Sequence, residues 1–520
     1  MREETQKKQE YRRAARGHIL EAYTVLLLAV FPFYNTDHYF SLLSDRAGFF
    51  QAATWVMVAA LLAEEVPHRI RIRKGARRDG IRGWIRRIPP EYAFLAAFLL
   101  VSAASTLLSD HRAEAWTGEA GRLQGLFMWL AYGTAFFCIS RSFCPGKRHI
   151  WLFLASGAIA ALWGICDYMG PGLSWWLADV KESQMHMFTS SIGNINTYTA
   201  FLIIGFSLSG AYAVFRDMWG KGAKQESAVL LAVFFLFSVA LATGRSDNAV
   251  IGIAAFFLFL PAGIQDTRQA SRYLGLLAVF LAAFPAAALL STHTGNPYME
   301  IPDGILLKAG IRGGMFFFIP SAAAAAAALC LSREDKPLCR FQRVWPALLA
   351  VSGIFFIMVC LDANIFPDTG RYGAARAYLE FNDDWGTYRG LCWRLAHESY
   401  GEFPFIKKLI GSGPETFGII MKQEHYQEMV QGCGQVFDSP HNESIQYLFC
   451  TGILGAACYY AFLASCLWKG IHGDAVRKTA AIAAITYTAV SFVNISVPIT
   501  QPYLIMLAAW CSSQKKEERK

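Results

Sequence analysis

Residues 229–243 read VLLAVFFLFSVALAT, and residues 249–264 read AVIGIAAFFLFLPAGI. Five residues separate the two runs. Neither run contains a charged residue, and residues 94–108, FLAAFLLVSAASTLL, form a third run of this kind. Soluble proteins carry about 25% charged residues, whereas this chain of 520 residues has 17% charged and 54% hydrophobic residues. Because a helix of about 20 mostly apolar residues crosses a bilayer core, the sequence predicts a polytopic membrane protein.

The predicted fold is all-α, with about 12 to 14 transmembrane helices. The segments with the required length and apolar content lie at residues 18–34, 48–65, 91–108, 123–140, 150–169, 197–215, 228–244, 247–265, 273–292, 314–332, 344–362, 442–468, 479–496 and 498–512. The last two are the least secure, since Pro498 and Gln501 interrupt what would otherwise be one bent pair.

The distribution of basic residues predicts the orientation. If the N-terminus is cytoplasmic, most of the 48 Lys and Arg residues fall in cytoplasmic connections, as the positive-inside rule requires. The basic run at residues 69–87 lies between two apolar segments, where orientation signals occur, so the net charge of +9 does not indicate nucleic-acid binding. The first 17 residues are polar and no cleavage site follows the first apolar run, so we expect that helix to remain as an anchor. Both termini are predicted to be cytoplasmic.

This topology divides the chain into five parts. They are a cytoplasmic basic tail (1–17), helices 1–11 (18–362), an extracytoplasmic loop (363–440), helices 12–14 (441–512) and a cytoplasmic tail (513–520). The loop is far longer than a usual connection, and long ordered loops tend to be functional. Its residues 378–400 predict an amphipathic helix along the outer membrane face, stopped by Phe403 and Pro404. Cys392 and Cys433 are the two cysteines expected outside, and the sequence leaves their pairing open.

Polar residues that stand out lie at the outer ends of the predicted spans and in the long loop. They are Arg122, Asn194, Asn196, Arg245, Arg389, Arg394, Lys407, Lys408 and His441. Ionisable groups deep in a membrane mark ion or proton paths, and this chain has almost none there. A transporter, such as a flippase, is expected to line a central route with charges, so the gathering of charges on one side favours a site at the outer face.

Several of these stretches, in this order, resemble the O-antigen ligase and O-antigen polymerase superfamily of bacterial polysaccharide assembly. The stretches are GRLQGLF (121–127), IGNINTYTAFL (192–202), TGRSDNAVIG (243–252), FPF (403–405), GSGPETF (411–417), DSPHNESIQYL (438–448) and GILG (452–455). Arg245 and Ser246 are transposed relative to the family's Thr-x-Ser-Arg segment. His441, followed by ten residues and then Gly452, resembles the spacing of the ligase signature.

The resemblance implies glycosyl transfer from an undecaprenyl-pyrophosphate-linked glycan to an acceptor hydroxyl, on the outer face of the bacterial cytoplasmic membrane. It also implies a reaction without metal, nucleotide sugar or cofactor. Arginine offers planar, permanently protonated donors, so Arg122, Arg245 and Arg389 are expected to bind the pyrophosphate. The acceptor hydroxyl needs a general base, and His441 is the candidate because imidazole titrates in the useful range.

Asn194, Asn196 and Asn442 are expected to bind the glycan or the acceptor, although asparagine also caps helices. Other readings stay open, since arginines at helix ends can reach lipid headgroups and Arg389 can pair with Glu398. The sequence does not decide between a ligase, whose acceptor is a lipid core, a wall polymer or a protein, and a polymerase, whose acceptor is another lipid-linked repeat. A flippase for the same glycan and a structural membrane scaffold are the competing classes.

Overall fold

The computed structural model describes residues 2–69, 88–119, 122–170, 180–216, 223–296, 304–366 and 370–513. The basic run at 69–87 and the tail at 513–520 lie outside the described residues except for one residue each, and Gly121 lies outside them too. Within these ranges the regular structure is helical apart from a short antiparallel pair, β1 (Phe188–Thr189) and β2 (Gly193–Asn194), and an isolated bridge. The predicted all-α fold is confirmed.

Ten helical segments of the described chain are long and apolar enough to cross a membrane. They belong to α1 (Arg2–Val25), α2 (His38–Arg69), α4 (Pro90–Leu108), α7 (Lys147–Met169), α8 (Ile195–Phe215), α9 (Ala223–Thr243), α11 (Thr267–Ser291), α12 with α13 (Ile305–Gly313 and Phe318–Ser332), α14 (Cys339–Ile365) and α20 (Glu443–Ile471). Shorter helices occupy the other four predicted segments, namely α6 (Leu126–Ser142), α10 (Asn248–Phe259), α21 (Ala475–Ser491) and α22 (Gln501–Ser512). The protein is therefore a polytopic membrane protein.

The centre of the bundle is α8, which is buried along its whole membrane-spanning length. Small residues on α8 let aromatic rings from its neighbours approach its backbone. A Cβ at Gly205 would lie 2.3 Å from the ring of Phe237 on α9, and one at Gly210 would lie 2.5 Å from the ring of Phe256 on α10. Close packing at small residues is the usual way in which helices associate in lipid. By contrast, the apolar segment of α14 is unburied, so this helix presents its side chains to the membrane.

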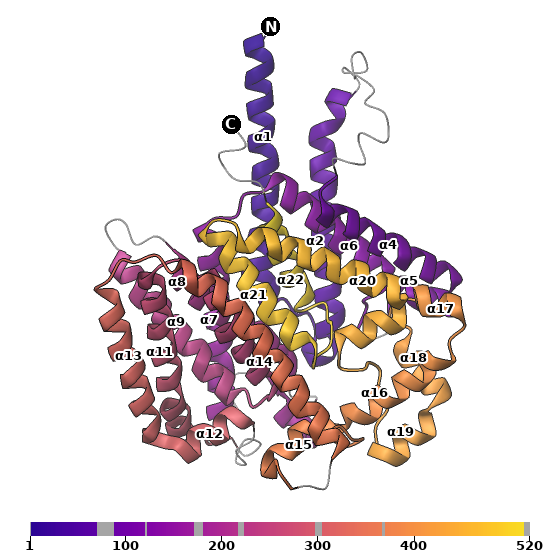
Figure 1. Cartoon of the computed structure of the whole chain (residues 1–520). Helices are drawn as coiled ribbons and strands as arrows, with labels where there is room; N and C mark the ends of the chain where they lie inside the picture. Colours follow the sequence, from indigo (N-terminus) through magenta and orange to yellow (C-terminus); the bar gives the residue numbers. More distant parts are fainter. Residues whose placement is uncertain are drawn as a thin grey trace.

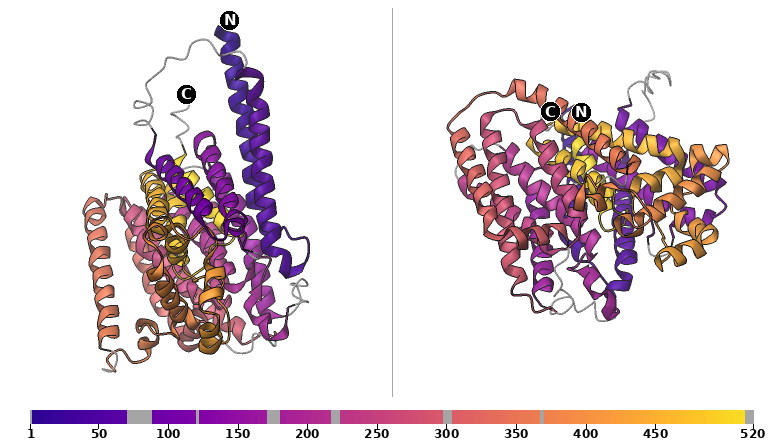
Figure 2. Two further views of the ribbon diagram at one scale, coloured as in Figure 1. Left: turned by 90° about the vertical axis from the view of Figure 1, so that its right-hand side faces the viewer. Right: turned by 60° about the horizontal axis from the view of Figure 1, so that its bottom comes forward.

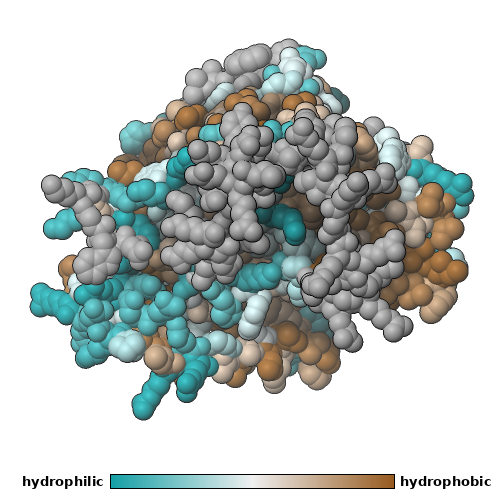
Figure 3. Space-filling model, turned by 90° about the horizontal axis from the view of Figure 1, so that it is seen from above, coloured by the Kyte–Doolittle hydropathy of each residue, from teal (hydrophilic) through white to brown (hydrophobic). Residues whose placement is uncertain are grey.

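The two ends of the bundle differ. The N-terminal part of α1 and the last turn of α22 lie toward one end, whereas α15 (Arg376–Leu379), α16 (Trp385–Glu402) and α19 (Tyr426–Cys433) lie toward the other (Figures 1 and 2). A view onto the first end has hydrophilic residues interspersed with apolar ones (Figure 3), as expected where a membrane protein meets water. Helices α15, α16 and α19 of the long loop thus lie at the end opposite the N-terminal part of α1.

The long loop is partly helical, and it packs against α20 of the bundle. It contains α15, α16, α17 (Phe405–Ile410), α18 (Phe417–Glu424) and α19. Leu395, Phe417, Met421 and Met429 form a core of their own with Phe449 on α20. The apolar side of α16 lies inside this core, and the expected position of this helix along the outer membrane face stays a prediction. As predicted, α16 ends before Phe403, but its regular part begins at Arg389, after three residues with positive φ.

Candidate functional site

Backbone strain is concentrated at the predicted site residues. In the described chain, the non-glycine residues with positive φ are Leu123, Ser190, Arg245, Thr387, Tyr388, Glu415 and His441. Arg245 and His441 are predicted site residues themselves, and all the others except Glu415 lie within four residues of Arg122, Asn194 or Arg389. Such conformations cost about 1–3 kcal/mol each and cluster at active sites. The strain therefore marks the same loops that the sequence selected, and it adds Glu415.

Arg122 is buried and holds the loop that carries His441. Its Nε donates to Asp438 Oδ2 at 3.2 Å and its NH2 donates to Asp438 Oδ1 at 2.5 Å. Only 6% of Arg122 is exposed, so it does not extend to the lipid headgroups. Burial lowers the pKa of Arg122, but the charges of Asp438 and Glu415 outweigh burial and raise it, and Arg122 in turn keeps the pKa of Asp438 low. This ion pair joins two segments that are far apart in the sequence.

Two glycines close the loop of Arg122. Gly118 has a φ of 93°, and a Cβ at Gly125 would lie 2.3 Å from the backbone nitrogen of Gly118. The second glycine of the GRLQG stretch is thus required by a close backbone approach rather than by chemistry. This approach fixes the position from which Arg122 reaches Asp438.

The loop of His441 is held by hydrogen bonds of its backbone, whereas the ring nitrogens of His441 have no hydrogen-bond partner among the described residues. Its N–H donates to Ser439 Oγ at 3.2 Å, and the indole of Trp393 donates to the carbonyl of Pro440 at 2.7 Å. Among the described residues, no hydrogen bond occupies either ring nitrogen of His441. Burial, together with the charges of Arg122 and Arg389, lowers the pKa of the imidazole to about 4, against the opposing charge of Asp438. His441 is therefore neutral at pH 7, with a lone pair available to accept a proton.

Arg389 is a cation of the site whose guanidinium has no partner among the described residues. It is half-buried, and burial lowers its pKa while the charge of Asp247 opposes this. Glu398, its possible partner from the sequence, accepts from Arg394 at 2.9 Å instead. Within the described part of the chain, no hydrogen bond or ion pair occupies the Arg389 guanidinium. The positive charge of Arg389 lowers the pKa of the His441 imidazole, so the two groups are electrostatically coupled.

The asparagines mainly tie helix ends together. Asn194 caps α8 by accepting from the N–H of Asn196 at 2.8 Å, and Asn442 caps α20 by accepting from the N–H of Ser444 at 2.8 Å. The side-chain oxygen of Asn196 accepts from Ser246 Oγ at 2.7 Å. The capping alternative therefore applies to Asn194 and Asn442. Their amide NH2 groups have no partner among the described residues, so the predicted role in glycan binding stays a prediction.

Arg245 lies in the turn between α9 and α10. A Cβ at Gly304 would lie 3.0 Å from the backbone of Arg245, and Asp247 accepts from the N–H of Ile305 at 2.7 Å. The turn thus joins the start of α12, while its Asp247 acts on Arg389. Arg245 is half-buried, so it does not project freely into the headgroups.

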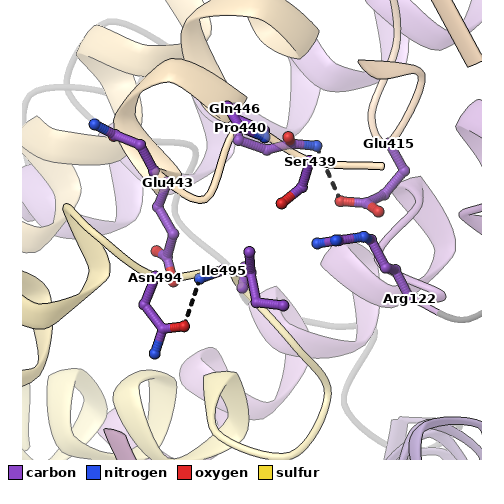
Figure 4. Close-up of a pocket in the computed structure, with 10 residues that line it drawn as sticks. Arg122, Glu415, Ser439, Pro440, Glu443, Gln446, Asn494 and Ile495 are labelled. Carbon is purple, nitrogen blue, oxygen red and sulfur yellow. Dashed lines mark hydrogen bonds between the residues drawn. The ribbon is translucent and has the colours of Figure 1, made fainter. Parts of the chain in front are cut away.

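A small polar cavity lies behind the His441 loop (Figure 4). Its lining residues are Arg122, Glu415, Ser439, Pro440, Asn442, Glu443, Gln446, Asn494, Ile495 and Ser496. Glu443 Oε1, Gln446 Oε1 and Ser496 Oγ are buried in its wall without a hydrogen-bond partner. The cavity has room for about one water molecule. It is therefore too small to enclose a glycan diphosphate.

Glu415 is a site residue that the sequence analysis missed. It lies within the quoted GSGPETF stretch, points toward Arg122 (Figure 4), and accepts from Gln446 Nε2 at 3.2 Å. Burial raises its pKa to about 7, with Arg122 opposing and Asp438 and Glu119 adding to the rise. Asp438 and Glu443 were missed as well, although both belong to the DSPHNESIQYL stretch. An acidic residue beside a predicted base was the signal that could have found them.

Close packing against the backbone of Leu409 explains why the residue at position 452 is a glycine. Its φ of 66° and ψ of −176° interrupt α20, and a Cβ there would lie 2.3 Å from the backbone of Leu409. The turn after α17 enters this interruption, where the N–H of Ser412 donates to the carbonyl of Phe449 and the N–H of Gly413 donates to that of Cys450. Gly452 therefore anchors the turn that presents Glu415.

The loop also contains a group of possible metal ligands and two cysteines that could form a disulfide. Glu398, His425 and Glu428 place ligand atoms within 4.8 Å of one another, but Arg394 forms ion pairs with both glutamates, which makes this group an ion-pair network. All twelve cysteines are free thiols. Cys392 donates to the carbonyl of Ser439 at 3.6 Å and Cys433 to that of Met429 at 3.1 Å, so these two do not pair.

Comparison with known proteins agrees with the geometry. Residues 304–460 match the family model described as O-Antigen ligase. This match confirms the predicted resemblance to the O-antigen ligase and polymerase superfamily for the segment from α12 into α20, which carries Arg389, His441 and Gly452. The stretches around Arg122, Asn194 and Arg245 lie outside the matched residues. Arg122 contacts the matched segment through Asp438, and the turn of Arg245 contacts it at Gly304 and Ile305. No curated protein matches the chain.

The depressed pKa of His441 makes the pH profile a test of the site. Because only the neutral imidazole accepts a proton, we expect kcat/KM to persist below pH 6 and to fall toward pH 4. Replacing Arg389 by glutamine removes a positive charge that disfavours the imidazolium, so the pKa of His441 rises and the acid limb moves to higher pH, by roughly one unit. Arg394→Gln, on the same helix but in the surface network, should leave the limb in place. An unchanged limb in Arg389→Gln would separate Arg389 from the imidazole.

Proposed function

We propose that this protein transfers a glycan from undecaprenyl pyrophosphate to an acceptor hydroxyl, on the extracytoplasmic face of the bacterial inner membrane. One observation carries the proposal. The positive charges of Arg122 and Arg389, from segments far apart in the chain, both lower the pKa of the His441 imidazole, whose ring nitrogens have no hydrogen-bond partner among the described residues. A neutral base beside fixed cations suits the attack of a hydroxyl on a sugar whose leaving group is an anion. The family match at residues 304–460 supports the same class of reaction.

The leaving diphosphate is assigned to the arginines. Within the described residues the Arg389 guanidinium has no hydrogen-bond or ion-pair partner, and Arg245 lies in the turn whose Asp247 opposes the lowering of the Arg389 pKa. Arginine forks match phosphate oxygens in pairs, so these side chains take on the charge that a divalent cation neutralises in other transferases. Arg122 is already paired with Asp438, so it contributes its positive charge to the site and binds phosphate directly only if Asp438 moves.

The proton of the acceptor is assigned to His441. A ring nitrogen accepts the hydroxyl proton as the hydroxyl oxygen attacks the anomeric carbon. The bond from this carbon to the diphosphate oxygen breaks, and its electron pair leaves with the diphosphate. The imidazolium then returns the proton to water or to the leaving group. Asn194, Asn196 and Asn442 are proposed to bind glycan or acceptor through their amide groups.

The acceptor defines the alternatives. A ligase joins the glycan to a lipid core, a wall polymer or a protein, and a polymerase joins it to another lipid-linked repeat. Both use the same donor and the same base. A flippase is a less favoured alternative, since the charges named above gather at one end of the bundle.

Reconstituted proteoliposomes test the proposal. We expect purified protein to form a new glycosidic bond when a defined undecaprenyl-pyrophosphate glycan and candidate acceptors are supplied. A ladder of products identifies a polymerase, and a single transfer to an acceptor identifies a ligase. Movement of the donor between leaflets without a new glycosidic bond would contradict the proposal and favour a flippase.

A further inference from the structure

Four aromatic rings gather beside the His441 loop, and we call them the aromatic shelf: Phe381, Trp385, Trp393 and Phe492. The centroids of Phe381 and Trp393 lie 5.9 Å apart with the rings stacked, and those of Trp385 and Trp393 lie 5.1 Å apart. Phe381 also lies 5.9 Å from Trp385, and Phe492, after α21, lies 5.9 Å from Trp393. Phe381 and Phe492 are 46% and 52% exposed, so the outer rings are open.

The shelf is fixed by hydrogen bonds that point inward. The indole N–H of Trp393 donates to the carbonyl of Pro440 at 2.7 Å, and that of Trp385 donates to the carbonyl of Tyr378 at 3.1 Å. Tryptophans that anchor a protein at the membrane interface keep the polar edge of the ring toward headgroups and water. Here both N–H groups are used by the backbone, so the shelf offers the faces of rings held in place.

The position of the shelf is set by the site. Trp393 bonds the carbonyl of the residue that precedes His441, and Arg389 lies one helical turn before Trp393 on α16, which places the two on the same face. The shelf is therefore continuous with the space where the proposed donor diphosphate and acceptor meet.

We propose that the aromatic shelf is a saccharide subsite, on which a pyranose ring of the substrate glycan stacks. This inference rests on the proposed function and deepens it, since it assigns the glycan a place on this chain. A pyranose has an apolar face of C–H groups and an edge of hydroxyls. The fixed rings match the apolar face, and Asn382 and Asp384, both exposed beside Phe381 and Trp385, offer polar groups to the hydroxyls. A stretch of hydrocarbon would leave these polar groups without a role.

Binding measured without transfer tests the subsite. The probes are undecaprenyl diphosphate, the same lipid carrying chitobiose, and free chitotetraose, each titrated into detergent-solubilised full-length protein. We expect the wild type to bind the chitobiose lipid about tenfold more tightly than the bare lipid, which is about 1.4 kcal/mol. Trp385→Ala removes this difference and leaves the affinity for the bare lipid unchanged, whereas Trp385→Phe keeps most of it. Trp468→Ala, which removes a 70% exposed tryptophan elsewhere on α20, changes neither affinity.

The remaining outcomes also decide the question. A loss confined to chitotetraose, with lipid affinities unchanged, places an acceptor sugar on the shelf and supports the subsite. A preference for the chitobiose lipid that survives both Trp385→Ala and Phe381→Ala overturns it. So does an equal loss for both lipids in Trp385→Ala, because the rings would then contact lipid. If the wild type binds chitotetraose through Trp385 but binds no undecaprenyl diphosphate, the proposed function fails and the subsite stands.

Discussion

Replacing His441 by alanine is expected to lower the rate of glycan transfer by about two to four orders of magnitude, the range that general base catalysis contributes. The ring is neutral, it has no hydrogen-bond partner among the described residues, and the positive charges of Arg122 and Arg389 lower its pKa. Its loss should lower kcat while the affinity for undecaprenyl diphosphate stays within a few fold, since the arginines remain. The measurement is single-turnover transfer in proteoliposomes with a labelled donor.

A second histidine variant, His397→Ala, controls for a loss of transfer that is caused by misfolding. His397 is exposed on α16, outside the cavity and its mouth, so His397→Ala should transfer at the wild-type rate. Both variants should insert and unfold as the wild type does. Full transfer by a correctly inserted His441→Ala protein would remove His441 from the chemistry.

Substituting Gly452 by alanine is expected to cost about 3 to 5 kcal/mol of folding free energy and to abolish transfer. Its φ of 66° and ψ of −176° fall in a region that is essentially restricted to glycine. The added Cβ would also lie 2.3 Å from backbone atoms of Leu409, which have no freedom to move aside. Thermal unfolding in detergent and the amount of inserted protein measure the effect.

The control lies in the same loop. Gly401, near the end of α16, has no neighbour within 4 Å of a Cβ, so Gly401→Ala should leave the unfolding temperature unchanged or raise it slightly. If Gly452→Ala unfolds at the wild-type temperature, then the backbone contact between α17 and α20 is not what this glycine provides.

The membrane helices could be predicted because apolar runs are local. Residues 229–243 need only their own composition to identify α9, and the end of α16 follows from Phe403 and Pro404. The start of α16 could not be predicted in this way, since no residue pattern at Gly386, Thr387 and Tyr388 signals their positive φ values. The same holds for the apolar side of α16, which finds a partner in α20 instead of lipid.

The site was predictable in residue type and only partly in pairing. Arg122, Arg389 and His441 stood out as charged or titratable groups at the ends of apolar runs. That Arg122 would be neutralised by Asp438, and that Glu415 would be buried beside it, depends on loops brought together from distant parts of the chain. The asparagines illustrate the opposite limit, because Asn194 and Asn442 have the capping role that their position just before a helix suggests.

An experimental structure with undecaprenyl diphosphate bound is the most direct measurement. We predict density for the diphosphate at the mouth of the polar cavity, with phosphate oxygens within hydrogen-bonding distance of Arg389. A ring nitrogen of His441 should face the space where the sugar would attach. Diphosphate bound at the end of the bundle where α1 begins, or on a lipid-facing surface remote from His441, would contradict it.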